Sequence, residues 1–496
     1  MEVANRNYRI AFYLNGALRE ESVRPDETAL ELLRERMHLR GVKEGCAEGD
    51  CGACTIAIGE WNHQHFRYRA INSCLFAAIQ LHGKVVITVE GLADSGSLHL
   101  IQQKLLDNHA VQCGYCTPGI VMSMFCLFAE IADPTEQQIK TALEGNLCRC
   151  TGYITILSAA RDITHTLQRN SPNAILPDYC TEVAMQLQSF AKKIEPHFQN
   201  SKEIRETISY HKPVSYSELT TVLSSLTRNE FRFVNGGTDV FVEQNVHRKF
   251  AQHLIDLSTI PELKRLERVG DNVFIGGAVT MQELLTSLDI RQHLPMLCDA
   301  LQMLGSHQIR NVATLAGNVA HASPIADGSV ALLAYGAIIE LLSPRGTREI
   351  PIDDFYLDYR KTALQPDEVI TTIRIPVASD FASFWKSSKR VAVDIASVNS
   401  AFTANIIDGR IVACRFAFGG VAKTPMLCND LPQLLLRRIP DETVIRECQD
   451  TVLRVFHPIS DVRGSAEYRR ILLKNHIRYH LSKLTASVKS IGGNHE

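Results

Sequence analysis

Eight of the 14 cysteines in this 496-residue chain form two sets of four within the first 150 residues. The first set reads C-x4-C-x2-C, followed by a fourth cysteine after nineteen intervening residues: Cys46, Cys51, Cys54 and Cys74. The second set joins a C-x2-C pair to a C-x-C pair: Cys113, Cys116, Cys148 and Cys150. Four thiolates are the ligand complement of a [2Fe–2S] cluster, and the first spacing is that of plant-type ferredoxins. The two sets therefore predict two small folds built around clusters, which would act as two one-electron centres in series.

Structural zinc is the main alternative for both sets, because four cysteine thiolates are also a common zinc site. The first set favours a cluster, since Gly45, Gly49 and Gly52 would allow the tight, positive-φ loop that brings backbone amides to the sulfurs. The second set leaves zinc open. A thioredoxin-type redox role for its C-x2-C pair is disfavoured, because the C-x-C pair offers those thiols a shared ligand role.

Composition limits the partners and the compartment. The chain is 45% hydrophobic and 21% charged with a net charge of −2, which is typical of a soluble protein and argues against nucleic acid or an anionic membrane as the main partner. No stretch approaches the roughly 18 apolar residues of a membrane span. With no signal-peptide pattern at the start, the cysteines point to a reducing, cytoplasmic location. We expect the other six to be plain buried thiols: Cys126, Cys180, Cys298, Cys414, Cys428 and Cys448.

The elements expected around the first set suggest a ferredoxin-like β-grasp domain. Residues 8–14 and 17–23 flank Asn15-Gly16 and predict a hairpin. A helix is expected over residues 27–37, and strands over 55–59 and 85–92. Helices then follow over 119–132, 134–145 and 154–167, which suggests a four-helix-type [2Fe–2S] bundle. Each cysteine pair of the second set precedes a helix, whose N-terminus favours an anionic cluster.

The expected fold class is multidomain α+β. Residues 1–92 would form the plant-type [2Fe–2S] domain and 93–168 the helical [2Fe–2S] domain. Residues 169–207 sustain no apolar period and are expected to be a linker. Alternating short strands and helices follow, which predicts α+β domains over 208–380 and 381–490.

Two glycine-containing loops after residue 230 are candidates for holding a pyrophosphate. FVNGGTDV and TLAGN each offer consecutive backbone N–H groups, although NGGTD alone is most often a strand-ending turn. Neither loop is a G-x-G-x-x-G fingerprint followed by a regular helix. Two one-electron centres need a two-electron partner to reach hydride chemistry, and a flavin provides one. Together these features favour a flavin nucleotide.

The order of the C-x4-C-x2-C loop, QCGYCTPG and GNLCRCTGY resembles the molybdenum hydroxylase family, the xanthine dehydrogenases in particular. The resemblance implies that Gln112 touches the pterin of a molybdenum cofactor. FVNGGTDV resembles the family's first FAD loop, and TLAGN followed by SPIAD resembles the second. The resemblance therefore implies an α+β FAD-binding domain of the xanthine dehydrogenase type over 208–380 and a C-terminal α+β flavoprotein domain over 381–490. The implied FAD-contacting residues are Phe233, Val234, Asn235, Gly236, Gly237, Thr238, Asp239, Val240, Leu304, Thr314, Leu315, Ala316, Gly317, Asn318, Asp327, Ile370 and Lys386.

The chain also departs from the family pattern near the flavin. Leu304 stands where animal relatives have an aromatic residue, and Ala392 and Val393 replace acidic residues of a flavin-side loop. Flavin binding should survive these changes, whereas the identity of the electron acceptor is put in question.

The resemblance implies the electron-transfer subunit of a bacterial xanthine dehydrogenase. A separate molybdenum-cofactor subunit, in an α2β2 hetero-oligomer, would hydroxylate hypoxanthine or xanthine. Electrons would pass through the second cysteine set, then the first, to FAD and on to NAD+. No catalytic acid or base for substrate is expected in this chain. One alternative keeps the cofactors for an aldehyde or N-heterocycle substrate, and another is a zinc-stabilised scaffold protein without redox function.

Overall fold

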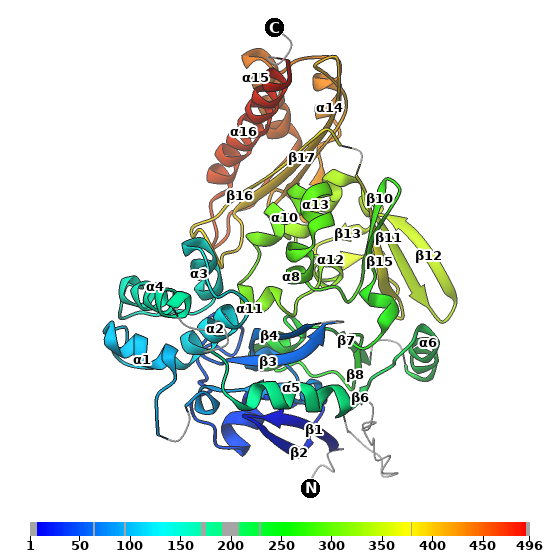
Figure 1. Cartoon of the computed structure of the whole chain (residues 1–496). Helices are drawn as coiled ribbons and strands as arrows, with labels where there is room; N and C mark the ends of the chain where they lie inside the picture. Colours follow the sequence, from blue (N-terminus) through cyan, green and yellow to red (C-terminus); the bar gives the residue numbers. More distant parts are fainter. Residues whose placement is uncertain are drawn as a thin grey trace. The chain divides into compact units, whose positions relative to one another are not determined.

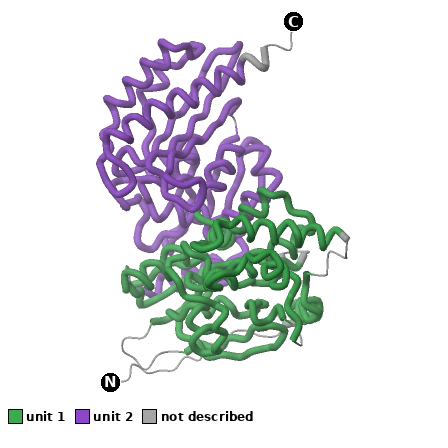
Figure 2. The backbone as a smooth tube through the Cα atoms, turned by 90° about the vertical axis from the view of Figure 1, so that its left-hand side faces the viewer, with its two compact units in different colours: residues 1–212, 229–256, 305–312 green, residues 213–228, 257–304, 313–496 purple. Residues whose placement is uncertain are grey.

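The computed structural model describes residues 7–62, 65–93, 96–169, 175–190, 208–227, 230–377 and 379–492 (Figure 1). The backbone divides into two compact units, which are coloured separately in Figure 2. Unit 1 comprises residues 1–212, 229–256 and 305–312, and unit 2 comprises residues 213–228, 257–304 and 313–496. The chain thus passes between the units five times. The multidomain α+β class is confirmed, while the domain boundaries drawn from the sequence stay predictions.

Unit 1 begins with a five-stranded mixed sheet in the order β2-β1-β5-β3-β4. Its strands are β1 (Tyr8–Leu14), β2 (Ala17–Val23), β3 (Thr55–Asn62), β4 (His65–Asn72) and β5 (Val85–Ile87). Strand β1 is parallel to β5, and the other neighbouring pairs are antiparallel. Asn15 and Gly16 have φ of +49° and +88°, as a two-residue type I′ hairpin requires. The hairpin and the ferredoxin-like plan are confirmed.

Two of the elements expected in this sheet domain differ in form. In place of a regular helix over 27–37 the chain makes a short π-helical segment, η1 (Glu31–Arg36). The strand expected over 85–92 ends at Ile87, and a 3-10 turn, η4 (Val89–Gly91), follows. The reason is local: Thr88 N donates to Asn15 Oδ1 at 2.9 Å, so a side chain takes the place of a further strand partner. Two more 3-10 turns, η2 (Ser73–Leu75) and η3 (Ala78–Leu81), precede β5.

Four helices follow the sheet, as the sequence predicts. They are α1 (Leu100–Asp107), α2 (Thr117–Glu130), α3 (Glu136–Leu143) and α4 (Ile154–Arg169). Helix α2 is buried over most of its length, with Phe125 and Met124 fully enclosed. Side chains of His99 and Thr135 cap the N-termini of α1 and α3. Burial of α2 on nearly all sides makes it the central helix of this group.

A further helix, α5 (Tyr179–Phe190), lies inside the segment expected to be a linker. Cys180, Val183 and Leu187 are buried in the same core as the helices. Trp61 Nε1 also donates to the carbonyl of Ala184 at 3.0 Å. The three apolar residues on one face were too few to show a period in the sequence, yet they suffice because the sheet covers them. Residues 170–174 and 191–207 of the expected linker lie outside the described residues.

A small parallel sheet completes unit 1. Its strands, in the order β6-β8-β7, are β6 (Ser209–His211), β8 (His253–Asp256) and β7 (Phe231–Val234). Helix α7 (Val240–His247) follows β7, so residues 235–239 form a strand-to-helix loop. The short helix α11 (His307–Arg310) also belongs to this unit.

Unit 2 contains an antiparallel sheet in the order β12-β11-β15-β10-β9. Its strands are β9 (Leu266–Val269), β10 (Asn272–Gly276), β11 (Ile338–Ser343), β12 (Gly346–Pro351) and β15 (Val369–Pro376). The helices are α6 (Tyr216–Ser225), α8 (Met281–Thr286), α9 (Leu288–His293), α10 (Pro295–Gln302), α12 (Leu315–His321) and α13 (Asp327–Tyr335). Strands β13 (Tyr356–Asp358) and β14 (Lys361–Thr362) pair separately, and 3-10 turns occupy η6 (Pro261–Lys264) and η7 (Ile352–Asp354). Helix α13 is buried along its whole length.

The C-terminal part of unit 2 packs helices on a second antiparallel sheet, in the order β16-β17-β18-β19. Its elements are β16 (Phe381–Ser387), β17 (Val398–Ile407), β18 (Arg410–Gly419), β19 (Met426–Leu427), α14 (Leu431–Leu435), α15 (Glu442–Val455) and α16 (Ala466–Gly492). The rings of Phe402 and Phe416 stack with centroids 4.5 Å apart in its core. Across the described ranges, no helix combines the length and apolar character needed to cross a membrane.

A chain of buried hydrogen bonds ties α16 to β16 and β17. The imidazole of His476 joins Ser387 Oγ at 2.9 Å to Ser400 Oγ at 2.7 Å. The imidazole of His480 extends the chain of hydrogen bonds, with one ring nitrogen 2.8 Å from Ser400 Oγ and the other 2.5 Å from Ser383 Oγ. Both histidines are completely buried. Each of their ring nitrogens therefore has a hydroxyl partner inside the protein.

Candidate iron–sulfur and FAD sites

The first cysteine set gathers between η1 and β3, with Cys74 brought in from η2. The thiols stand in two hydrogen-bonded pairs, Cys46 with Cys51 and Cys54 with Cys74. The amides of Glu48 and Asp50 also donate to Cys46 Sγ, at 3.5 and 3.2 Å. The hydrogen bond from Cys51, joined by these amides, lowers the pKa of Cys46 to about 5. Amides directed at sulfur are the environment that stabilises an anionic cluster.

The three glycines of this loop serve two different purposes. Gly49 and Gly52 have φ of +84° and +66°, as the sequence predicts. Gly45 does not have positive φ, so the expectation for it is wrong. It is needed for space, since a Cβ there would lie 2.7 Å from Cys51 Sγ. The loop therefore closes tightly on its own sulfur atoms.

The second cysteine set lies at the starts of two helices, as expected. Cys116 is the N-cap of α2, and Cys148 and Cys150 shortly precede α4. The thiols again form pairs, Cys113 with Cys150 and Cys116 with Cys148. Cys113 and Cys150 are exposed, whereas Cys148 is buried.

Hydrogen bonds hold the buried side of the second set. Cys148 Sγ lies 3.2 Å from Thr151 Oγ1, and Cys148 N donates to the hydroxyl of Tyr153 at 2.8 Å. Gln112, beside Cys113, is exposed. The second set thus presents one thiol pair outward and keeps the other inside.

The donor chemistry of both sets fits [2Fe–2S] clusters. Each set supplies four cysteine thiols, and a [2Fe–2S] cluster takes two thiolate ligands on each of its two irons. The backbone amides directed at Cys46 Sγ would stabilise the negative charge of the first cluster. The residues fit the cluster.

The six other cysteines do not join either set. Cys126, Cys180, Cys428 and Cys448 are buried, whereas Cys298 and Cys414 are half-buried. Burial raises the pKa of all six thiols. The expectation of plain buried thiols is confirmed for the four enclosed cysteines.

The first candidate FAD loop joins β7 to α7 in unit 1. Gly237 has φ of +70°, and a Cβ there would lie 2.6 Å from Phe241 Cδ2 and 2.8 Å from the Leu75 carbonyl. Gln80 Nε2 donates to the carbonyl of Asn235 at 2.9 Å, which fixes the start of the loop. The side-chain nitrogen of Asn235 is buried without a hydrogen-bond partner. A parallel strand, a glycine turn and a helix N-terminus with an unused donor fit a phosphate-bearing ligand.

The second candidate loop caps α12 in unit 2. Thr314 is the N-cap, and its Oγ1 accepts from Gly317 N at 3.0 Å. The side-chain oxygen of Asn318 is buried without a hydrogen-bond partner. Leu315 and Ala316 are buried. This loop, too, keeps a polar atom available for a ligand.

Asp327 and Lys386, both predicted to touch FAD, contact each other inside unit 2. Lys386 Nζ lies 2.7 Å from Asp327 Oδ2 and 2.8 Å from the Met303 carbonyl, next to Leu304. Asn399 Nδ2 donates to the other Asp327 oxygen at 2.6 Å. Burial raises the pKa of Asp327, and Lys386 opposes that rise. Asn399 was missed in the sequence because an asparagine in a strand gives no signal of its partner.

The remaining predicted FAD residues divide between the two units. Phe233, Val234 and the loop up to Val240 belong to unit 1. Leu304, Ile370 and the residues of the second loop belong to unit 2, where Ile370 is buried in β15.

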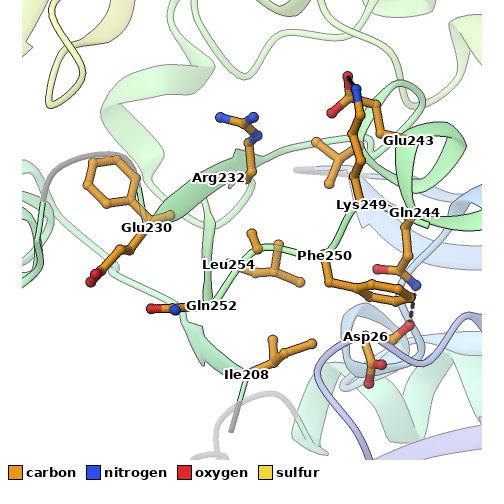
Figure 3. Close-up of a pocket in the computed structure, with 13 residues that line it drawn as sticks. Asp26, Ile208, Glu230, Arg232, Glu243, Gln244, Lys249, Phe250, Gln252 and Leu254 are labelled. Carbon is orange, nitrogen blue, oxygen red and sulfur yellow. Dashed lines mark hydrogen bonds and ion pairs between the residues drawn. The ribbon is translucent and has the colours of Figure 1, made fainter. Parts of the chain in front are cut away.

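A cavity of about 240 Å³ lies beside β7 and α7 in unit 1 (Figure 3). Its lining mixes charged and apolar side chains, among them Arg232, Glu243, Lys249 and Phe250. Gln244 Nε2 closes one side by donating to the carbonyl of Asp26 at 2.6 Å. None of the predicted cluster cysteines lines this cavity.

Four protein-family models match the chain. Their descriptions are "2Fe-2S iron-sulfur cluster binding domain" for residues 12–78, "[2Fe-2S] binding domain" for 88–161, "FAD binding domain in molybdopterin dehydrogenase" for 203–378 and "CO dehydrogenase flavoprotein C-terminal domain" for 383–484. The chain therefore has two [2Fe–2S] domains and an FAD-binding domain.

Curated relatives are similar over nearly the whole chain. Xanthine dehydrogenase of Emericella nidulans is 31% identical over 93% of this chain and 38% of its own length. Xanthine dehydrogenase of Drosophila pseudoobscura pseudoobscura is 29% identical over 95% of this chain and 39% of its own length. Aldehyde oxidase 1 of Bos taurus is 29% identical over 94% of this chain and 38% of its own length. The chain spans about two fifths of the length of these relatives.

Solved structures match 57% of the chain. A chain of a Cu,Mo-CO dehydrogenase is 27% identical and is matched over 99% of its own length, with a TM-score of 0.54. A chain of quinoline 2-oxidoreductase from Pseudomonas putida 86 is 25% identical and 98% covered, also with a TM-score of 0.54. Together with the two iron–sulfur domains, the FAD-binding domain and the relatives above, these matches show that the chain belongs to the molybdenum hydroxylase family.

Proposed function

We propose that this chain is the electron-transfer subunit of a xanthine dehydrogenase. It would take electrons from a molybdenum site on a partner subunit during hypoxanthine or xanthine hydroxylation and pass them to FAD and on to NAD+. The observation that carries the proposal is the thiol arrangement. Two cysteine sets of different spacing, each folded into two pairs, stand in one chain with an FAD-binding domain.

The chain's own residues would position and tune the cofactors. When bound, the clusters carry single electrons and the flavin couples them to hydride transfer. Cys46, Cys51, Cys54 and Cys74 would hold one cluster, and Cys113, Cys116, Cys148 and Cys150 the other. Amides of Glu48 and Asp50 would stabilise negative charge on the first cluster. The unpaired side-chain atoms of Asn235 and Asn318 would hydrogen-bond FAD.

The outward-facing thiols support a partner at the second cluster. Cys113 and Cys150 are exposed, and Gln112 beside them is exposed as well. Tyr115 is 49% exposed and Ile154 76% exposed in the same segments. A partner that carries a molybdenum cofactor would cover this surface, in an assembly we expect to be α2β2. Electrons would then enter at the second set before they reach the first.

The purified chain tests the proposal directly. We expect a red-brown protein with iron–sulfur and flavin absorption, iron and acid-labile sulfide, and oxidation of NADH by an artificial acceptor. Xanthine should not be turned over until a molybdenum-containing partner is added, and that partner should co-purify at equal stoichiometry. A colourless zinc protein would end the redox proposal, and xanthine turnover by this chain alone would end the partner proposal.

A second candidate is the same role in an enzyme for aldehydes or N-heterocycles. Aldehyde oxidase 1 of Bos taurus and quinoline 2-oxidoreductase are among the similar proteins, which supports this reading. Steady-state turnover of the assembled complex with xanthine, an aldehyde and quinoline would separate the two candidates. Electrons arrive at this chain in either case, so its cofactor content cannot distinguish them.

The acceptor is a distinct question, because the flavin-side loop lacks the acidic residues of the animal enzymes. Ala392 and Val393 replace them, and Val393 has φ of +50°, a conformation that β-branched residues rarely adopt. We propose NAD+ as the acceptor. Rapid mixing of the reduced complex with NAD+ or with oxygen tests this, and faster reoxidation by oxygen would contradict it.

A further inference from the structure

The two cluster loops touch each other through backbone groups in unit 1. Leu147 N donates to the carbonyl of Cys51 at 2.9 Å, and Asn146 Nδ2 donates to the carbonyl of Gly52 at 3.1 Å. Cys51 is a predicted ligand of the first cluster, and Leu147 immediately precedes Cys148 of the second. The path along the chain from Cys51 Sγ to Cys148 Sγ therefore crosses one hydrogen bond.

Glycines make this close approach possible. A Cβ at Gly52 would lie 2.2 Å from the carbonyl oxygen of Gly145, and a Cβ at Gly119 would lie 2.1 Å from that of Gly52. Both distances are too short for a real side chain. The two loops and the start of α2 thus meet backbone to backbone.

The orientation of the Asn146 side chain is set by two buried donors. Its Oδ1 accepts from Ser123 Oγ at 2.7 Å and from Gln308 Nε2 at 2.9 Å. Gln308 Nε2 also donates to Ser123 Oγ at 2.9 Å. All three side chains are 2% exposed or less. If the Asn146 amide turned over, its oxygen would face the Gly52 carbonyl and its nitrogen would face Gln308 Nε2, so neither contact could be made.

Gln308 reaches this position from a distant part of the chain. It lies 162 residues after Asn146, in helix α11. A Cβ at Gly145 would lie 2.1 Å from Gln308 Oε1, so the second loop is shaped around this side chain. In the same helix, Arg310 Nη2 pairs with Glu144 Oε1 at 2.5 Å.

The same helix also lies against the first loop. A Cβ at Gly49 would come within 3.0 Å of Ile309 Cδ1, so there is no room for a side chain between them. Residues 305–312 therefore contact both cluster loops.

We propose that Gln308 is a positioning residue for electron transfer between the two clusters. Together with Ser123, it fixes the orientation of the Asn146 amide. The amide in turn holds the Cys51-Gly52 segment and the Asn146-Leu147 segment at a fixed position relative to each other, and so sets the separation of the two cysteine sets. The inference rests on the proposed electron-transfer function. It assigns a role in that function to a residue outside both cysteine motifs.

The test is the magnetic interaction between the two clusters in the full chain with its cofactors. In the unaltered chain, the reduced clusters should give two paramagnetic signals split by their mutual coupling at low temperature. Gln308→Met keeps the bulk of the side chain and removes its donor. We expect full iron and sulfide content and both signals, with loss of the resolved splitting and slower equilibration of electrons between the clusters after a reducing pulse.

Gln449→Met is the matched control. Gln449 is 8% exposed and also donates from Nε2 to a backbone carbonyl, that of Lys474 at 2.9 Å, but it lies in α15 of unit 2. Its replacement should lower thermal stability without changing the splitting. A purely structural role for Gln308 would give the same result in both variants.

Ser123→Ala is the second variant, and it serves if Gln308→Met does not fold. It removes the other donor to Asn146 Oδ1 by deleting one oxygen atom, so the splitting should change in the same direction. Splitting and equilibration rate that remain unaltered in every folded variant would overturn the inference while leaving the proposed function intact. An unaltered chain without any cluster signal would instead refute the proposed function.

Discussion

The ammonium group of Lys386 lies 2.7 Å from the carboxylate of Asp327, and the two side chains are only 4% and 6% exposed. Asn399 and the Met303 carbonyl complete the hydrogen bonds of the pair. Both charges of this pair, and most of the polar atoms around them, therefore have hydrogen-bond or ion-pair partners inside unit 2. Such a pair contributes little when intact and costs much when one partner is removed.

Lys386→Met should therefore lower the free energy of unfolding by about 3–5 kcal/mol, because it leaves the Asp327 carboxylate buried and unpaired. The double variant Asp327→Asn with Lys386→Met should recover much of that loss. Chemical denaturation of the three proteins measures both effects, and FAD content would report the predicted contact with the flavin. Lys389→Met is the control, since Lys389 is exposed. Equal losses for the two lysine variants would contradict the prediction.

Cys148→Ser should remove one of the two cluster signals and leave the other signal and the FAD. Cys148 shares a hydrogen-bonded pair with Cys116, so its loss would leave one iron with an incomplete ligand set. Paramagnetic resonance of the reduced protein and flavin absorbance are the measurements. Cys126→Ser is the control, because Cys126 is a buried thiol within α2 and outside both sets. Two unchanged signals in Cys148→Ser would show that the ligand grouping is wrong.

Gly237→Ala should lower both stability and FAD content. Its φ of +70° strains any side chain, and the new Cβ would meet Phe241 and the Leu75 carbonyl at less than 3 Å. Gly83→Ala isolates the backbone effect, since Gly83 has φ of +72° with nothing within 4 Å. We expect a cost of about 1 kcal/mol at Gly83 and clearly more at Gly237, measured by thermal unfolding. Flavin should be lost only from the Gly237 variant.

Acid should destabilise the C-terminal part of unit 2. Burial lowers the pKa of His476 to about 3, and burial with the nearby His476 and Lys483 lowers that of His480 well below its ordinary value. The unfolded chain therefore binds protons at these side chains before the folded chain does. Their contribution to the free energy of unfolding is complete above about pH 6.5 and falls as the pH drops toward 3, by about 2 kcal/mol for His476 at pH 5.

Denaturation of the chain at pH 7.5 and pH 5 measures this loss. The double variant His476→Gln with His480→Gln should be less stable at pH 7.5 and should show a weaker dependence on pH. Replacing His165, which is exposed in α4, should leave the dependence as it is. An equal slope in the double variant would show that other groups cause the acid sensitivity.

Local signals predicted much of unit 1. The Asn15-Gly16 turn, the helices after both parts of the second cysteine set and the positive φ of Gly49 and Gly52 follow from short-range chemistry. The interpretation failed where partners are distant in sequence. Helix α5 shows only three apolar residues on one face, and its burial depends on contacts such as that of Trp61 with Ala184. Strand β4 was missed although its sequence carries a local signal, since Arg67 and Arg69 alternate with the apolar residues of the strand as in a half-buried strand.

The candidate sites also contain residues that local sequence signals predict and residues that they do not. The cysteine sets are recognisable because their spacing is itself the signal. Gln308, Ser123 and Asn146 are ordinary polar residues whose meaning arises from meeting in the core. A polar run such as SHQIRN between apolar segments is the one hint the sequence offers, since buried polar residues require partners.

The chain passes between the two units five times, so neither unit is one continuous segment. All eight predicted cluster cysteines precede the first passage, at residues 212–213, whereas both candidate flavin loops follow it. The intact chain therefore keeps these segments at a high effective concentration whatever the dilution. An electron-transfer chain assembled from separate proteins has no such covalent link and would come apart on dilution.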